Sequence, residues 1–282
     1  MNNLQTNRQI CTLKTIHGHN IKVFEGDFIA RKIIEKGIYE GPLLEFVSQI
    51  LIKMQEPIVL DIGANIGNHS LAFSLDARKV FAFEPVPEIF SLLSANIKQN
   101  NINNIQPVNL ALSDNEAEKE LYMNTSGNVG ASSFDKRDDN SLLVAVTLCR
   151  GDEFIKKENV ENIDFMKIDV EGHELAVLEG LKSSIRKNRP FIVMEWNDNR
   201  TIDRINSSSI LDDLFFDYQI YVLGNNYDKN YWEGKSFSRI RRKLHRMFIK
   251  KHAKLYRFSS NRLYKNLLFV PNGKEDLLPL KS

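Results

Sequence analysis

Acidic side chains follow several predicted strands of this sequence, and one of them begins a turn rich in glycine. The stretch PIVLDIGANIGNHS, residues 57–70, runs from a buried apolar strand to Asp61 and then through Gly63 and Gly67. Glu84 follows the next predicted strand, 23 residues after Asp61. A carboxylate at this second strand end is placed to accept hydrogen bonds from both hydroxyls of a ribose. The pattern therefore predicts a pocket for a nucleoside.

The turn after Asp61 departs from the glycine pattern of dinucleotide-binding folds. That pattern requires glycines at positions 63, 65 and 68, but Asn65 and Asn68 stand at the last two. The carboxylate of Asp61 would also repel a pyrophosphate. A ligand with a positive charge and no phosphate fits this turn better, and adenosine joined to a cation describes S-adenosylmethionine. The alternative is structural, with Asp61 capping the following helix and Gly63 only making the turn.

A second group of candidate residues follows the predicted strand 163–169. The segment DVEGH supplies Asp169, Glu171 and His173, which we interpret as candidate catalytic residues. A reaction that removes a proton from its substrate needs a positioned base, and the ordinary histidine pKa near 6.5 suits that role. The alternative for His173 is a structural place in the first turn of the next helix, where an acid such as Glu174 complements the helix dipole.

Glu195 and Asn197 follow the neighbouring predicted strand, 191–196. Together with Asp169 they could form an all-oxygen site for Mg²⁺, which prefers carboxylate, amide and water ligands. This arrangement is similar to that of catechol-type O-methyltransferases, in which acids after these two strands hold magnesium. Mg²⁺ is therefore a candidate cofactor beside S-adenosylmethionine.

Strands and helices alternate along the middle of the chain. The predicted strands cover 58–62, 79–83, 106–112, 163–169 and 191–196, with helices from about 67 and at 87–100, 174–187 and 208–216, and final strands at 218–223 and 266–270. This alternation predicts an α/β fold with a mostly parallel sheet that has helices on both faces. Ligands of such sheets bind beyond the carboxyl ends of the strands, where the candidate residues lie.

We expect four parts along the chain. Residues 1–56 read as short strands and helices that pack on a core, and residues 57–226 read as the core that binds S-adenosylmethionine. Residues 227–262 read as a basic insertion, and residues 263–282 as a final strand and tail.

The motifs together resemble the FkbM family of S-adenosylmethionine-dependent methyltransferases. The matching stretches are VLDIGANIGNHS, VFAFEPVPEIF, LALSD and IDFMKIDVEGHELAVLEG, within a similarity that runs from about residue 37 to 197. The resemblance implies a Rossmann-like class I methyltransferase fold with a seven-stranded, mostly parallel sheet whose last strand is antiparallel. It also implies methyl transfer to a hydroxyl of a sugar, glycan or natural product.

The resemblance further suggests positions that bind the cofactor. In it, the turn from Gly63 to Asn68, which includes Asn65 and Gly67, wraps the methionine part, Glu84 followed by Pro85 holds the ribose, and Ser113 and Asp114 flank the adenine. The alternative for Ser113 and Asp114 is a helix cap or turn, since such pairs favour turns in any protein.

The composition is that of an ordinary globular protein, with 282 residues, 42% hydrophobic and 26% charged. The first residues lack the apolar core of a secretion signal, and no stretch approaches the roughly 18 apolar residues of a membrane span. The two cysteines, Cys11 and Cys149, fit neither a disulfide framework nor a metal cluster. We therefore expect a cytoplasmic protein.

Residues 235–262 hold eleven of the 38 Lys and Arg residues and no acid. Apolar residues recur there at helical spacing among the cations, which predicts a basic amphipathic helix. Such a helix could contact the inner membrane surface or a partner, or hold an anionic acceptor such as a charged glycan or lipid-linked sugar. No motif that reads nucleic acid accompanies it, which disfavours that partner. A non-catalytic or membrane-associated cofactor-binding protein and an NAD-type oxidoreductase are the alternative functions.

Overall fold

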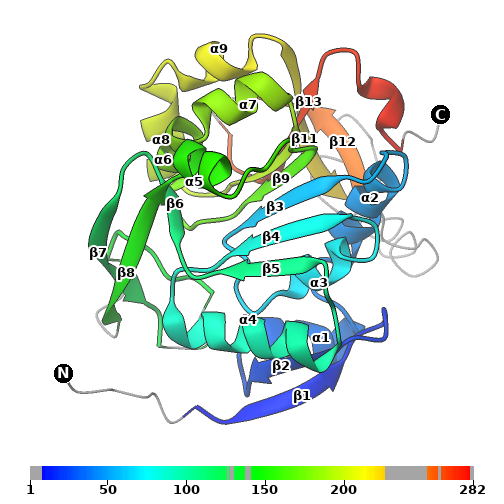
Figure 1. Ribbon diagram of the computed structural model, residues 1–282, viewed down its shortest axis with the longest axis vertical. Helices are drawn as coiled ribbons and strands as arrows, with labels where there is room; N and C mark the ends of the chain where they lie inside the picture. Colours follow the sequence, from blue (N-terminus) through cyan, green and yellow to red (C-terminus); the bar gives the residue numbers. More distant parts are fainter. Residues whose placement is uncertain are drawn as a thin grey trace, which may run out of the picture.

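The computed structural model describes residues 8–125, 127, 130–136, 141–225, 253–259 and 262–279. An eight-stranded sheet forms its centre (Figure 1), with strand order β12–β11–β13–β10–β9–β3–β4–β5. In that order the strands are Ala253–Arg257, Tyr218–Asn225, Tyr264–Pro271, Phe191–Trp196, Phe165–Ile168, Ile58–Ile62, Lys79–Phe83 and Ile105–Val108. The pairs from β5 to β10 are parallel, while β13 runs antiparallel to both β10 and β11.

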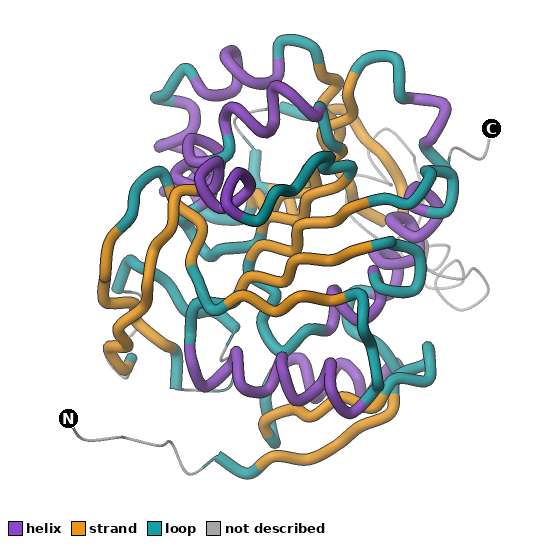
Figure 2. Tube along the Cα trace, in the orientation of Figure 1, coloured by secondary structure: helices purple, strands orange, loops and turns teal. Residues whose placement is uncertain are grey.

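Helices cover both faces of this sheet (Figures 1 and 2). One face packs against α1 (Phe28–Lys36), α2 (Gly41–Leu51), α3 (Asn68–Phe73) and α4 (Pro87–Gln99). The other packs against α5 (Gly151–Lys157), α6 (Glu174–Gly180), α7 (Lys182–Asn188), α8 (Asn199–Asn206) and α9 (Ile210–Phe215). The fold is therefore Rossmann-like α/β, as the sequence predicted.

The alternation of side chains along the central strands places the polar residues of the site. In β3, Leu60 packs into the core beneath α5–α9, while Val59 packs beneath α1–α4. Because side chains repeat with a period of two, Asp61 shares the face of Val59. By the same rule Lys167 in β9 and Glu195 in β10 lie on the α1–α4 side. Three polar side chains are thus brought to one face of the sheet near its carboxyl edge.

Two smaller sheets complete the described structure. A hairpin of β1 (Ile10–Lys14) and β2 (Asn20–Phe24) lies below α1 and α4 in Figure 1. A three-stranded sheet has the order β6 (Ala111–Ser113), β8 (Leu142–Arg150) and β7 (Ala117–Met123). A short 3₁₀ helix, Glu275–Leu277, follows β13.

The sheet differs from the expectation in two places. It has eight strands rather than seven, because β12, which lies inside the predicted basic insertion, pairs antiparallel with β11 at the edge. The predicted single strand 106–112 is two strands in different sheets, β5 and β6. Asn109 marks the break, since its side-chain amide donates to the carbonyls of Glu84 and Pro85 at 2.8 and 2.9 Å and ties the chain there.

The last two predicted strands are β11 and β13, which pair antiparallel over most of their length. The predicted basic amphipathic helix falls mostly within residues 226–252, which lie outside the described residues. Among the helices that the structure describes, none combines the length and apolar character needed to cross a bilayer.

Candidate active site

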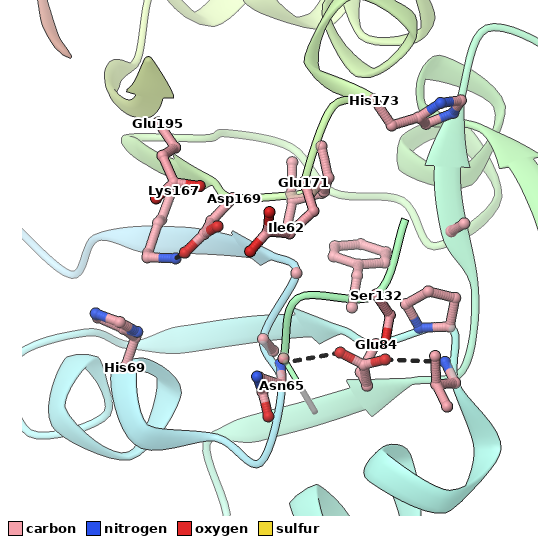
Figure 3. A pocket seen from close by; sticks show the side chains of 18 of the residues that line it. Ile62, Asn65, His69, Glu84, Ser132, Lys167, Asp169, Glu171, His173 and Glu195 are labelled. Carbon is pink, nitrogen blue, oxygen red and sulfur yellow. Dashed lines mark hydrogen bonds and ion pairs between the residues drawn. The ribbon is translucent and has the colours of Figure 1, made fainter. Parts of the chain in front are cut away.

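A pocket opens beyond the carboxyl ends of β3, β4, β9 and β10 (Figure 3). The predicted residues that line it are Gly63, Asn65, Asn68, Glu84, Pro85, Asp169, Glu171, His173 and Glu195. The pocket therefore joins the residues predicted for the cofactor with those predicted for catalysis.

Five predicted residues are not among those that line the pocket. Asp61 is fully buried in β3 below the turn, and Gly67 ends the turn as the N-cap of α3. Ser113 is buried in the second sheet, and the exposed Asp114 follows it. Asn197 is exposed beyond β10, so the structure does not place it with Asp169 and Glu195 in the pocket.

The backbone amides of the turn after β3 donate hydrogen bonds within the protein. The N–H groups of residues 63 to 67 all donate hydrogen bonds at 2.7–3.0 Å. Gly63 and Ala64 donate to Phe83 O, and Asn65 donates to Glu84 Oε2. Ile66 donates to Asn65 Oδ1, and Gly67 donates to Ala64 O. A phosphate-binding loop needs such amides to point at the ligand. The structure therefore gives a second reason, independent of the missing glycines, why this turn does not suit a pyrophosphate.

Glu84 is the acid at the end of β4, and its side chain points into the pocket (Figure 3). Its Oε2 accepts from Asn65 N at 3.0 Å and its Oε1 from Val86 N at 2.9 Å. Burial raises the pKa of Glu84 to about 7, against the lowering effect of these two amides. Each carboxylate oxygen keeps a further lone pair, so Glu84 can still accept hydrogen bonds from two ligand hydroxyls.

Lys167 is a buried cation among the acids of the site. Its Nζ donates to Asp169 Oδ2 at 2.8 Å, and its side chain is 2% exposed. It stands directly opposite Asp61 in the pairing of β3 and β9. Burial lowers the pKa of Lys167, but the charges of Asp169, Asp61 and Glu40 outweigh burial, so this pKa lies above the ordinary lysine value. The lysine therefore stays charged and compensates these acids.

Asp61 has one oxygen that the protein leaves without a partner. Its Oδ2 accepts from Ser70 Oγ at 2.5 Å, while its buried Oδ1 has no hydrogen-bond partner among the described residues. A buried acceptor without a donor is costly. Asp61 therefore adds a buried negative charge beneath the turn to the carboxylates that line the pocket, and this charge fits a cationic ligand such as the methionine sulfonium part of S-adenosylmethionine.

Three carboxylates meet on the far side of the pocket from Glu84. Oxygens of Asp169, Glu171 and Glu195 all lie within 4.8 Å of one another, and Figure 3 shows Asp169 between Glu171 on one side and Lys167 and Glu195 on the other. Burial and the charges of Asp169 and Glu171 raise the pKa of Glu195 to about 10. Burial raises the pKa of Asp169, but Lys167 outweighs this and leaves it below its ordinary value. At neutral pH Glu195 therefore holds a proton and Asp169 the charge.

His173 lies on the other wall of the pocket, at the start of α6. Its Nε2 is 3.0 Å from Ser113 Oγ, and its ring centroid is 4.6 Å from that of Phe134. Burial, together with the charge of Lys119, lowers the pKa of His173 to about 4. The imidazole is therefore neutral at pH 7, and its Nε2 is engaged by Ser113 rather than open to a ligand.

This geometry predicts a small effect of His173→Gln. We expect turnover to fall less than about tenfold, whereas loss of a general base typically costs about 10²–10⁴-fold. The comparison is Asp169→Asn, which should lose far more activity. Initial rates at saturating methyl donor measure both variants, and a hundredfold loss in His173→Gln with unchanged donor affinity would restore the histidine as the base.

The loop before β8 forms an outer wall of the pocket. Ser133 Oγ donates to Glu171 O at 2.7 Å. Arg204 donates to Asp135 Oδ2 at 2.8 Å and to Gly172 O at 3.2 Å. The loop is thus fastened to the segment that carries Glu171.

The sequence reasoning missed the N-terminal side of the pocket, which Tyr39 and His69 line. His69 Nε2 lies 2.9 Å from Glu40 Oε2, and Lys265 pairs with the other oxygen of Glu40. Burial raises the pKa of Glu40, but His69 and Lys265 outweigh it, so the carboxylate stays charged. Two features of the sequence could have indicated this side of the pocket. His69 stands two residues after Gly67 of the turn, and Tyr39 lies in the stretch GIYEGPL, residues 37–43.

The family model and the curated relatives described here are all methyltransferases. A family model described as the methyltransferase FkbM domain matches residues 61–257. Hexuronic acid methyltransferase AglP of Haloferax volcanii is 29% identical over 141 residues, which cover 50% of this chain and 56% of AglP. 2-O-methyltransferase NoeI of Sinorhizobium fredii is 26% identical over 166 residues, which cover 52% of this chain and 66% of NoeI. The chain thus spans between half and two thirds of the length of these relatives.

Among solved structures, a methyltransferase FkbM from Methylobacillus flagellatus KT superposes with a TM-score of 0.45 at 18% identity. The superposition covers 76% of this chain and 43% of that one.

Proposed function

Because the chain belongs to the family of FkbM methyltransferases, we propose that it transfers a methyl group from S-adenosylmethionine to a hydroxyl of a sugar or another hydroxylated acceptor. The observation that supports this proposal most is the pairing of an acid-lined pocket with a turn whose amides from residue 63 to residue 67 donate inside the protein. That pairing favours a cationic nucleoside over a dinucleotide.

On the donor side, Glu84 accepts hydrogen bonds from the ribose hydroxyls. The turn from Gly63 to Asn68 lies along the methionine part, with Asp61 beneath it. The adenine lies toward Pro85 and the Leu110–Leu112 segment, which line that end of the pocket. When bound, S-adenosylmethionine supplies an electrophilic methyl group.

On the acceptor side, Asp169 orients the acceptor hydroxyl and takes its proton. Lys167 Nζ, 2.8 Å from Asp169 Oδ2, stabilises the negative charge that develops on the acceptor oxygen. The protonated carboxyl of Glu195 donates a hydrogen bond to Asp169 and fixes the orientation of that carboxylate. Holding the acceptor oxygen in line with the methyl group can supply about 7–11 kcal/mol of the barrier reduction.

The carboxylates of Asp169, Glu171 and Glu195 are also the ligand type that Mg²⁺ prefers. An ion there would compete with Lys167 for Asp169 and would have to displace the proton of Glu195. We therefore propose the arrangement with Lys167 as the working one, and magnesium as the alternative that the activity test decides.

Calorimetry and a transfer assay test this function. The protein should bind S-adenosylhomocysteine and not NAD. It should transfer labelled methyl from S-adenosylmethionine to saccharides or small hydroxylated acceptors, and EDTA should leave the rate unchanged. Binding of NAD without binding of S-adenosylhomocysteine would contradict the proposal, and loss of activity in EDTA that Mg²⁺ restores would assign the three carboxylates to the metal.

Donor affinity should rise with pH around neutrality because of Glu84. With its pKa at about 7, the carboxylate is mostly protonated at pH 6 and ionised at pH 8, and the ionised form accepts ribose hydroxyls better. The Kd for S-adenosylhomocysteine should therefore fall about tenfold from pH 6 to pH 8. Glu84→Gln should bind more weakly and lose this dependence, while Glu161→Gln, at an exposed position, should behave as wild type. The same slope in Glu84→Gln would refute the assignment.

The raised pKa also has a consequence for folding without ligand. The contribution of Glu84 to stability is complete below the pKa of the unfolded chain, near 4.3. It is lost as the pH rises through about 7.

A further inference from the structure

A second cavity adjoins the candidate active site, between α1, α2 and the end of α3. Its volume is about 920 Å³, within the range of small-molecule sites. Phe28 and Tyr39 line both this cavity and the first pocket, so they form a wall that the two spaces share. The roles assigned to the donor and to the acceptor hydroxyl leave this second space unused.

The lining of the second cavity is apolar in its interior and polar at its margins. Leu44 and Phe73 are buried side chains of its wall. Glu45, Gln49 and Asp76 add carboxylate and amide groups, and Lys32, Lys36 and Lys265 add cations. Sugars present apolar C–H faces and hydroxyl edges, so a wall of this mixed kind matches a saccharide better than it matches a purely apolar chain.

Tyr39 lies where the two spaces meet. Its ring packs edge-on against Phe28 at 5.9 Å, and Lys265 Nζ stands 5.5 Å from its centroid on another side. Burial and the charges of Glu40 and Asp169 raise the pKa of Tyr39 above the ordinary value, so the phenol keeps its proton. The side chain therefore links the acids on the acceptor side of the first pocket to the mouth of the second cavity.

We propose that the second cavity is a subsite for the sugar unit next to the one that is methylated, so that the acceptor is a saccharide of at least two units. The inference rests on the proposed transfer to a sugar hydroxyl. The wall of this subsite comes largely from residues 28–49, which precede the region matched by the family model. The subsite is thus a property of this chain's N-terminal segment.

Filling the cavity with a bulky side chain tests the proposal. Ala72→Trp on α3 and Gln49→Trp on α2 each place an indole in the cavity from a different helix. Ala72 and Gln49 are both partly exposed, and neither lines the first pocket. The matched control is Lys98→Trp, at an exposed position of α4 that lines neither cavity. Melting temperature and the Kd for S-adenosylhomocysteine confirm that each variant is folded and that its donor site is intact.

Acceptor KM is compared for methyl glycosides of glucose and glucuronic acid and for di- and trisaccharides that end in the same sugars. For the wild type and Lys98→Trp, the larger acceptors should have a KM about tenfold lower or better, since a filled subsite adds binding energy. Ala72→Trp and Gln49→Trp should remove this advantage and leave the KM of the methyl glycosides unchanged.

The outcomes separate the subsite from the proposed function. Equal KM for small and large saccharides in the wild type, or an advantage that survives both tryptophan variants, would overturn the subsite alone. Binding of S-adenosylhomocysteine without transfer to any of these saccharides would overturn the sugar acceptor and the subsite with it.

Discussion

Lys167→Met should destabilise the protein by about 3 kcal/mol at pH 7. The lysine is 2% exposed, bonds Asp169 and faces Asp61, which is fully buried. Removing one partner of a buried ion pair typically costs about 3–5 kcal/mol, because the other charge stays buried without compensation. Asp169 is 30% exposed toward the cavity, so water screens part of its charge and the loss should fall at the lower end.

The loss of stability in Lys167→Met should be larger at neutral pH than at acid pH. Lys167 holds the pKa of Asp169 below its ordinary value, so this pair contributes stability above the unfolded aspartate pKa, near 3.9, and loses it as the pH falls further. The deficit should therefore be full at pH 7 and smaller below about pH 4. Urea unfolding at both pH values measures it, and an equal deficit at both would contradict the charge pairing.

Lys167→Met should also lose about 10²–10³-fold in turnover, the range seen when one donor to a developing oxyanion is removed. The matched control is the double variant Lys167→Met, Asp169→Asn, which removes the uncompensated charge as well. It should recover part of the stability, and its turnover stays low in any case because Asp169 is the proposed base. A loss of turnover below about tenfold in folded Lys167→Met would contradict a role of the lysine at the acceptor oxygen.

The donor side of this site was predictable because its residues follow one another along the chain. Asp61, the glycine turn and Glu84 lie within two strand–turn units, and their positions depend on local alternation and on the rule that ligands bind at the carboxyl edge. Lys167 was visible in the sequence but had no assigned role. Its partner Asp61 stands opposite it only because β3 and β9 are neighbours, and the order of strands is not encoded in any local pattern.

Ser113, Asp114 and Asn197 were predicted for the site but are not among the residues that line the pocket. Ser113 and Asp114 were expected just after one long strand, 106–112, but the Asn109 side chain ties the chain at the end of β4 and the backbone continues into the three-stranded sheet. Asn197 was predicted for the site because it follows the strand 191–196, but a position after a strand does not fix the direction of a side chain. The register of β10 against β13 shifts between Glu195 and Trp196, so the strand is irregular just before Asn197.

Gly63→Ala should abolish binding of the methyl donor, because the added methyl group would disturb both the turn after β3 and the segment that carries Asp169. Gly63 has a φ of +83°, and a Cβ added there would meet Asp169 O at 1.8 Å and Asp169 C at 2.8 Å. These are backbone atoms of the neighbouring strand end, so relief requires the turn after β3 and the segment after β9 to separate. That separation would displace Asp169 from Lys167 together with the turn that lies along the donor.

We expect at least about a hundredfold loss of affinity for S-adenosylhomocysteine and a loss of stability of about 3 kcal/mol, from strain at positive φ and from overpacking. The matched control is Gly273→Ala, which has nearly the same φ of +85° but nothing within 4 Å of the added Cβ. It carries the conformational cost without the clash, so it should lose about 1–2 kcal/mol and bind the donor normally. Titration calorimetry and urea unfolding compare the two variants. Equal behaviour would show that the contact between the β3 turn and Asp169 does not hold the two halves of the site together.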